Sequence, residues 1–284
     1  MMVTHPQPNG GFRWVQLASG PALVCEALEP YARHFFTTRA WLLGERRTDV
    51  RDGWEEVARA AGVGVEQFRR LHQVHGCDVA IHRSGDAPSV DTPHADIVLT
   101  DDDSLAVAVQ TADCLPVLVV DRATRAVAAV HAGWRGLVTS VPSVAVDRMA
   151  AVFGSRRVDL LVAIGPAIGA CCYEVGEDVR VRFEQQGFPR DQIERWFLTM
   201  PAVWPNNPPM PALSPKRRAH HWFFDSWSCV RDQLTAAGVS SDQIFGADLC
   251  TASHPSMFCS YRRDGAIAGR LAGVVRGQKS EVRS

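Results

Sequence analysis

The sequence of 284 residues predicts a mixed α/β fold, α+β in character, with mixed and partly antiparallel sheets. Short apolar runs rich in Val, Ile and Phe recur between Gly, Pro and Asp, and they alternate with segments of helical spacing. Three apolar runs also follow one another within 96–120 with only turns between them, which favours antiparallel pairing. Because no G-x-G-x-x-G or Walker-type loop occurs, a plain doubly wound nucleotide-binding fold is not expected.

Each predicted element follows from its local pattern. The apolar runs predict strands at 34–38, 78–82, 96–100, 105–110, 115–120, 126–131, 158–164, 247–251, 257–261 and 271–275. Amphipathic spacing predicts helices at 52–61, 139–153, 177–186 and 225–237. Asp225 and Gly238 are expected to cap the last helix.

The proline-rich segment 201–221 is expected to be an irregular surface loop. Its length and position would allow a domain boundary. Because apolar runs resume directly after it, we predict instead a single domain, 1–284, with a loop insertion at about 201–221.

Composition excludes several partners. The chain has 30 Lys and Arg against 31 Asp and Glu, and its longest basic run is the three residues 216–218, so no nucleic-acid partner is expected. No run approaches the ~20 apolar residues of a membrane span. The N-terminal segment lacks a basic start and an apolar run, so we expect no signal peptide and a cytoplasmic location. There the eight cysteines would serve as core residues, metal ligands or nucleophiles.

Three segments place possible metal ligands beside turn-forming residues at the ends of predicted strands. They are HQVHG at 72–76, TADCLP at 111–116 and HAGWRG at 131–136. One cysteine and two histidines suit zinc and leave its fourth position open. The spacing is too long for a zinc finger. The residues alone therefore also permit a Cys114 nucleophile activated by His131, or a buried cysteine near hydrogen-bonded histidines.

Other polar residues have two interpretations each. Asp113 either orients a ligand or forms a turn. Arg135 and Arg262 either bind an anionic substrate or make surface contacts. We interpret Cys171 and Cys172 as structural, because neighbouring cysteines do not easily share one metal ion.

The ordered set of segments resembles the laccase-domain family, also called multicopper polyphenol oxidoreductases, whose members are described as purine nucleoside phosphorylases. The resemblance covers most of the chain from residue 72 onward. The matching segments are HQVHG at 72–76, ADIVLT at 95–100, TADCLPVLVVD at 111–121, AVAAVHAGWRG at 126–136, AIGPAIGACCYEVG at 163–176 and CTASHPSMFCSYRRDGAIAGR at 250–270.

The resemblance implies a metal site, a fold and an activity. The metal ligands would be His75, Cys114 and His131, holding Zn²⁺ or alternatively Cu²⁺. The fold would be a layered α/β/β/α sandwich shared with bacterial toxin deamidases. The activity would be phosphorolysis of adenosine, inosine, guanosine or methylthioadenosine, with hydrolytic deamination of adenosine beside it.

The resulting hypothesis gives these residues roles. His75, Cys114, His131 and Asp113 are the expected catalytic residues. The expected substrate-binding residues are Arg39, Arg135 and Arg262, as clamps for phosphate, and His72, as a proton shuttle.

Two departures from the family put the substrate range in question. A Gly-Gly-Val-Ser segment usually follows the arginine aligned with Arg39, and here the text reads TTRAWLLGERR. The helix near 225 has Val230 in place of asparagine. Alternative functions are a copper-dependent, laccase-like polyphenol oxidase, a cysteine hydrolase using Cys114 and His131, and a non-enzymatic assembly protein.

Overall fold

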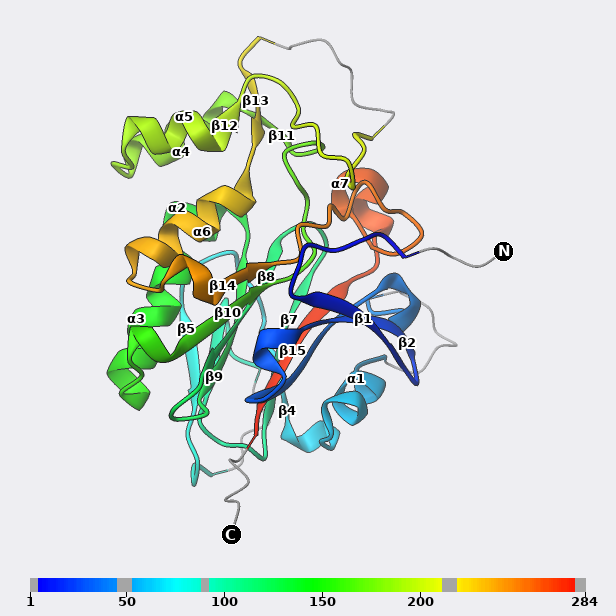
Figure 1. Cartoon of the computed structure of the whole chain (residues 1–284), viewed down its shortest axis with the longest axis vertical. Coiled ribbons are helices and arrows are strands. Elements are labelled where there is room, and N and C mark those ends of the chain that lie inside the picture. The colour runs from blue at the N-terminus through cyan, green and yellow to red at the C-terminus, as the bar shows by residue number, and fades with distance from the viewer. Residues whose placement is uncertain (1–4, 45–52, 88–91, 211–218, 279–284) are drawn as a thin grey trace.

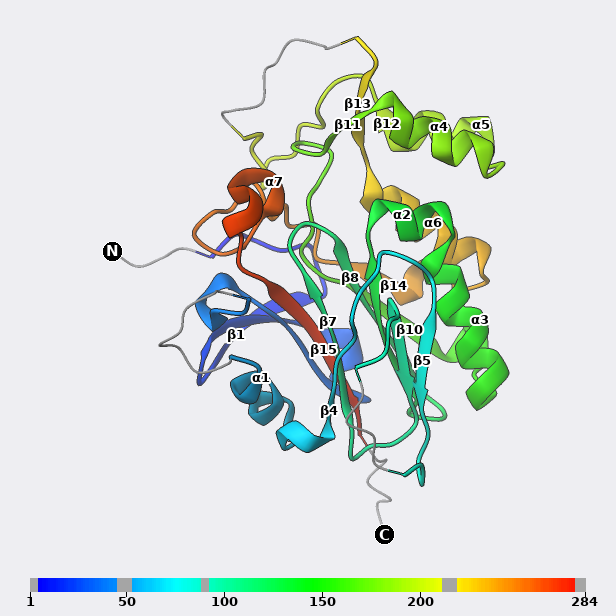
Figure 2. The same cartoon turned by 180° about the vertical axis from the view of Figure 1, so that it is seen from behind.

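The structure, a computed structural model, describes residues 5–44, 53–87, 92–210 and 219–278 (Figure 1). It confirms a mixed α/β fold with several sheets. Two sheets have six strands each, and a third, smaller sheet lies at one end of the molecule beside two helices (Figures 1 and 2).

The first sheet is antiparallel except at one edge, where β4 pairs parallel to β7. Its strand order is β1 (Phe12–Leu17), β2 (Gly20–Cys25), β3 (Ala32–Thr37), β15 (Leu271–Gly277), β7 (Ala106–Thr111) and β4 (Phe68–Arg69). Helix α1 (Gly53–Ala61) covers its outer face.

The second sheet is mixed, because its two edge strands, β14 and β5, pair parallel to their neighbours. Its order is β14 (Ile244–Gly246), β10 (Leu160–Ile164), β8 (Leu115–Asp121), β9 (Val127–Ala132), β6 (Ile97–Thr100) and β5 (Val79–His82). The helices on its outer face are α2 (Trp134–Val138), α3 (Val141–Phe153) and α6 (Ser226–Ala236).

A third sheet and two further helices lie beyond the end of the second sheet (Figure 1). The sheet order is β11 (Glu174–Gly176), β13 (His221–Phe224) and β12 (Phe197–Leu198). Helices α4 (Glu177–Gln185) and α5 (Arg190–Trp196) pack beside it, and the short helix α7 (Tyr261–Asp264) precedes β15.

Alternation along the strands produces a four-layered arrangement, helix on sheet on sheet on helix. In β8, Val117 and Val119 pack with the helices, whereas Leu118 and Val120 pack against the first sheet. In β7 and β15 one set of side chains joins the core between the sheets and the other meets α1. Because successive side chains of a strand point to opposite faces, the central strands of both sheets are buried on both sides.

Most predicted elements are present, but two predicted strands are wrong. The run 257–261 is irregular and then enters α7, whose first turn is capped when the Ser260 hydroxyl accepts a hydrogen bond from the Arg263 amide. The run 247–251 forms no strand, because β14 ends at Gly246 and Asp248 has a φ of 48°. A left-handed residue interrupts an extended strand.

The run 96–120 is not a simple antiparallel meander. β6 and β8 both pair with β9 in the second sheet, whereas β7 crosses to the first sheet. Apolar patterning could not reveal this crossing, because a strand that is buried on both faces has the same apolar sequence pattern in either sheet.

The proline-rich segment is irregular where it is described, with one isolated bridge between Trp204 and Asn207. Residues 211–218, including the basic run, lie outside the described residues, as do residues 45–47 of the altered segment after Arg39. Within the described ranges, no helix combines the length and apolar character needed to cross a bilayer.

Candidate metal centre and its pocket

Two of the three predicted ligands come from neighbouring strands of the second sheet. His131 lies in β9, and Cys114 directly precedes β8. The pairing of Pro116 with His131 sets the register of the two strands. The sheet itself therefore brings the thiol and the imidazole to one place.

His75 reaches the same place from the loop before β5. Its backbone is left-handed, with a φ of 62°. The Asp96 carboxylate holds this turn, accepting hydrogen bonds from the amides of Val74 at 3.2 Å, His75 at 3.0 Å and Gly76 at 2.6 Å. The buried carboxylate thus offsets the unusual backbone and fixes the third ligand.

Gln73 ties this loop to the first sheet. Its side-chain amide donates to the Gln110 carbonyl at 2.7 Å and accepts from the Gln110 amide at 2.8 Å. These two hydrogen bonds to Gln110 of β7 resemble the backbone pairing between neighbouring strands. The loop that carries His75 is consequently anchored to both sheets.

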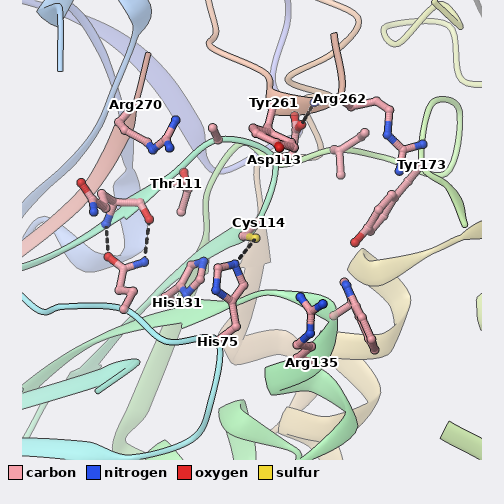
Figure 3. Close-up of a pocket in the computed structure, with 15 residues that line it drawn as sticks. His75, Thr111, Asp113, Cys114, His131, Arg135, Tyr173, Tyr261, Arg262 and Arg270 are labelled. Carbon is pink, nitrogen blue, oxygen red and sulfur yellow. Dashed lines mark hydrogen bonds between the residues drawn. The ribbon is translucent and has the colours of Figure 1, made fainter. Parts of the chain in front are cut away.

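The ligating atoms of His75, Cys114 and His131 lie within 4.8 Å of one another (Figure 3). The sulfur of Cys114 is 4.0 Å from Nε2 of His75. Gly133 makes room for them, because a Cβ there would lie 3.0 Å from the His75 ring and 3.1 Å from the Cys114 sulfur. Two imidazoles and a thiolate in this arrangement fit one zinc or copper ion.

Asp96 also sets the orientation of His131. Nδ1 of His131 donates to the Asp96 carboxylate at 2.7 Å, so Nε2 is the nitrogen left to face an ion. Burial lowers the pKa of His131, but the Cys114 thiolate and Asp96 outweigh it and raise this pKa to about 9. Burial raises the pKa of Cys114, yet His131 and His75 lower it to about 6. Both shifts favour the thiolate form of Cys114 and the imidazolium form of His131.

The three residues open into a pocket of about 550 Å³. Its wall carries three arginines, Arg135, Arg262 and Arg270, and Figure 3 shows them around the cluster. Apolar and aromatic side chains complete the wall, namely Trp134, Ile168, Tyr173 and Tyr261. Cationic and aromatic groups around one cavity suit a ligand with an anionic part and a flat ring.

Asp113 lines the pocket, but its carboxylate is already engaged. It accepts hydrogen bonds from the Thr251 hydroxyl and the Arg262 amide, each at 2.6 Å. Its φ is 89°, and burial raises the pKa of its carboxyl despite these bonds. This geometry supports a positioning role, holding the segment before α7 against the start of β8.

Arg135 and Arg262 line the pocket as expected for substrate-binding residues. The guanidinium of Arg135 lies 4.5 Å from the Trp134 ring centre. Arg262 donates to the Glu174 carbonyl at 2.6 Å and lies 5.4 Å from the Tyr173 ring centre. The guanidinium groups of both arginines therefore pack against aromatic rings of the same pocket wall.

Arg39 and His72 are not brought to the pocket wall. Arg39 is exposed, and its guanidinium donates to the Pro255 carbonyl. His72 packs against His94, with ring centres 4.2 Å apart, and lines a smaller neighbouring cavity. Neither position places the side chain at the candidate metal ligands.

Sequence reasoning missed Asp96, Gln73, Gly133 and Arg270 as site residues. Asp96 and Arg270 were part of matching segments, and each is a charged residue next to an apolar run. That local signal marks a strand end but does not tell which strand lies beside it. Their roles depend on sheet pairing, which the chain pattern did not provide.

Comparison with known proteins now decides the family. Residues 39–278 match the family described as multi-copper polyphenol oxidoreductase laccase. The chain belongs to this family. The resemblance noted in the sequence is thereby confirmed.

Relatives and a solved structure agree with this assignment. A purine nucleoside phosphorylase of Xylella fastidiosa (strain Temecula1) is 34% identical over 277 residues, covering 96% of this chain and 94% of the relative. A purine nucleoside phosphorylase of Bacteroides thetaiotaomicron is 35% identical over 184 residues, 63% of this chain, and the match spans 60% of that relative's length. The crystal structure of the Bacillus licheniformis hypothetical protein YfiH gives a TM-score of 0.77 at 25% identity, covering 95% of this chain and 100% of the other.

Proposed function

We propose that this family member is a metal-dependent purine nucleoside phosphorylase. It releases the base from adenosine, inosine, guanosine or methylthioadenosine with phosphate, and deaminates adenosine as a side activity. One observation carries the proposal: the His75, Cys114 and His131 cluster opens into the same pocket as three arginines and several aromatic rings. Both relatives are named purine nucleoside phosphorylase, which supports the phosphorolysis part of this proposal.

His75, Cys114 and His131 are the proposed ligands of Zn²⁺, with Cu²⁺ as the alternative ion. When bound, the ion would supply Lewis-acid catalysis at the reacting group. Asp96 keeps the His131 ring in the tautomer that presents Nε2. Gly133 keeps the space beside the cluster open.

The arginines are the proposed phosphate-binding residues. Arg135 is exposed at the pocket wall, and hydrogen bonds to backbone carbonyls hold Arg262 and Arg270. A guanidinium offers several donors in a planar fork that suits phosphate oxygens. We assign this task to Arg135, Arg262 and Arg270, and not to Arg39, which lies outside the wall.

The aromatic wall is the proposed base-binding surface. Arg135 packs against the ring of Trp134, and Arg262 packs against the ring of Tyr173. Tyr261 is the first residue of α7. A purine packs well against such rings. Since His72 lies in the neighbouring cavity, we give it no direct part in proton transfer.

We also propose that residues 1–284 form one domain related to the toxin deamidases and that the protein works in the cytoplasm. Support for one domain comes from the shared core between the two sheets, to which strands from both ends of the sequence contribute.

Incubation with adenosine or inosine, with and without phosphate, tests the activity. Wild type should release free base only when phosphate is present, and Cys114→Ala should lower this rate about 100-fold or more. Cys77→Ala is the matched control, since that cysteine does not line the pocket. Conversion of adenosine to inosine without phosphate reports the deaminase reaction. A zinc-loaded, folded wild type that releases no base from any of the four nucleosides contradicts the proposal.

A cysteine hydrolase is the second candidate, because the Cys114 sulfur lies within 4.8 Å of a ring nitrogen of His131. Alkylation with iodoacetamide separates the two functions. The hydrolase requires that metal-free protein is active and that alkylation of Cys114 abolishes this activity.

A laccase-like oxidase is the third candidate, suggested by the family description. Among the described residues, histidine takes part in one of the two groups of three or more metal-ligating side chains. Several copper ions would need more such groups. Oxygen uptake with a phenolic substrate, dependent on copper, would establish this function instead.

A further inference from the structure

A second group of metal-ligating side chains lies behind the wall of the pocket. Cys171 and Cys172 are in the segment between β10 and β11, and Cys250 follows β14. All three residues are fully buried, and their sulfurs lie within 4.8 Å of one another. The sequence interpretation treats the paired cysteines as structural because neighbouring cysteines do not easily share one ion. Here both sulfurs lie close enough to share an ion, together with a third thiol from a distant segment.

The backbone around the three sulfurs is ordered by strand-like contacts. Ala167 forms an isolated bridge with Cys250, and its amide donates to the Leu249 carbonyl at 3.2 Å. The Thr251 amide donates back to the Ala167 carbonyl at 3.1 Å. These bonds fix the two segments relative to each other and hold the sulfurs together.

Polar groups, and not only apolar side chains, lie next to the sulfurs. The amide of Gly169 donates to the Cys250 sulfur at 3.3 Å. The hydroxyl oxygen of Ser253 lies 3.6 Å from the Cys171 sulfur and 3.5 Å from the Cys172 sulfur. Because this hydroxyl donates to the Pro208 carbonyl at 2.7 Å, its lone pairs are left to face the sulfurs.

We propose that the buried thiols of Cys171, Cys172 and Cys250 form a second metal site, for a thiophilic ion. Thiolate sulfur prefers Zn²⁺ and Cu⁺ among biological ions. The three thiols release their protons when the ion binds. For Zn²⁺ the Ser253 oxygen is the fourth donor, whereas Cu⁺ is held by the three sulfurs alone.

This ion would cross-link two parts of the pocket wall. Ile168 and Tyr173 lie on the segment of the paired cysteines, and Thr251, which holds Asp113, follows Cys250. Structural metal sites of this closed kind stabilise folds directly. The second site therefore serves stability and does not depend on the proposed enzymatic function.

Zinc analysis of variants tests the proposal, beginning with a double variant that leaves the buried cysteines intact. Wild type, purified with zinc and dialysed against a metal buffer, should retain about two ions per chain, and the double variant His75→Ala/Cys114→Ser about one. Cys250→Ser should also retain about one. The triple variant should retain none.

Cobalt substitution identifies the donors of the retained ion. In the His75→Ala/Cys114→Ser protein, Co²⁺ should give intense sulfur-to-metal charge-transfer bands, which are lost when Cys250→Ser is added. A double variant with native circular dichroism that binds neither Zn²⁺ nor Cu⁺ overturns the proposal. Retention of the ion in a folded triple variant overturns it as well, because the ion then lies elsewhere. A Cu⁺ titration of the same double variant distinguishes the two ions.

Discussion

Asp96 links two candidate metal ligands, His75 and His131, through one buried carboxylate. It accepts three amide hydrogen bonds in the turn of His75 and one from the His131 ring. Replacement by asparagine keeps the shape but removes the charge and turns one acceptor into a donor. The change thus acts on ligand geometry rather than on the ligands themselves.

We expect Asp96→Asn to weaken zinc binding by about 10-fold to 100-fold, since this is the usual effect of losing such a partner. Competition with a chromophoric chelator measures the affinity. Asp101→Asn is the control, because Asp101 also binds a backbone amide, that of Ser84, but is exposed. Equal affinities of the two variants would show that Asp96 does not organise the site.

Gly133 matters for space and not for backbone conformation. Its φ of −79° is open to any residue, so Gly133→Ala should cause little backbone strain. The new methyl group would press on His75 and Cys114 and lower the zinc affinity about 10-fold, because metal sites tolerate little displacement. Gly10→Ala, with free space around it, is the control. Chelator competition together with the melting temperature separates lost affinity from lost stability; unchanged affinity would refute the steric explanation.

Arg135 offers a test of the phosphate pocket, given the proposed function. Arg135→Ala should raise the KM for phosphate about 10-fold while changing the KM for inosine less, because a charge-assisted contact is lost. Arg190→Ala serves as the control, since Arg190 is exposed on α5. Initial rates at varied phosphate measure the effect. A larger change for inosine than for phosphate would assign Arg135 to the nucleoside instead.

Helix α6 shows how a single cap supports an element. The Asp225 carboxylate accepts from the Ser228 amide at 3.0 Å and from the Ser228 hydroxyl at 2.7 Å. Asp225→Ala should therefore lower the free energy of unfolding by about 0.5–2 kcal/mol. Urea titration followed by circular dichroism measures this, with exposed Asp242→Ala as control. A loss no larger than that of the control would mean that tertiary packing alone holds the helix start.

Element prediction succeeded where local chemistry decides the structure. The cap at Asp225 and the strands β8 and β9 follow directly from residue type and apolar patterning. The hairpin of β1 and β2 was missed, because its alternating pattern is weak and it precedes the long apolar runs. At 257–259 the apolar residues are buried without forming a strand, and local patterning does not separate these cases.

At the scale of the whole molecule, the core between the sheets holds the site together. Leu118 is fully buried there, so Leu118→Ala should cost about 2–5 kcal/mol of unfolding free energy. Val158→Ala is the control, because that side chain is 61% exposed. Urea unfolding with fluorescence and circular dichroism measures both. A change below about 1 kcal/mol for Leu118→Ala would mean that the sheets do not pack as described.

The candidate site could be predicted only in part from the sequence, because some of its contacts join segments that lie far apart in the chain. His75, Cys114 and His131 were selected because their surrounding segments match a family, and the structure brings these three together. Asp96 acts between segments, so its contacts exist only once the strands are paired, and Arg270 lines the pocket because β15 takes its place in the first sheet. Long-range pairing is the information that residue patterns lack.

The central position of β15 has a consequence for biosynthesis. β15 lies between β3 and β7. Arg270 of the pocket directly precedes β15 in the chain, and Arg262 lies shortly before, in α7. A nascent chain that has not yet reached residue 271 leaves one edge of each of these strands without a partner. Exposed edges of this kind invite pairing with other chains. The first sheet can therefore form completely only after residues 271–277 have been synthesised, and the pocket is completed in the same step.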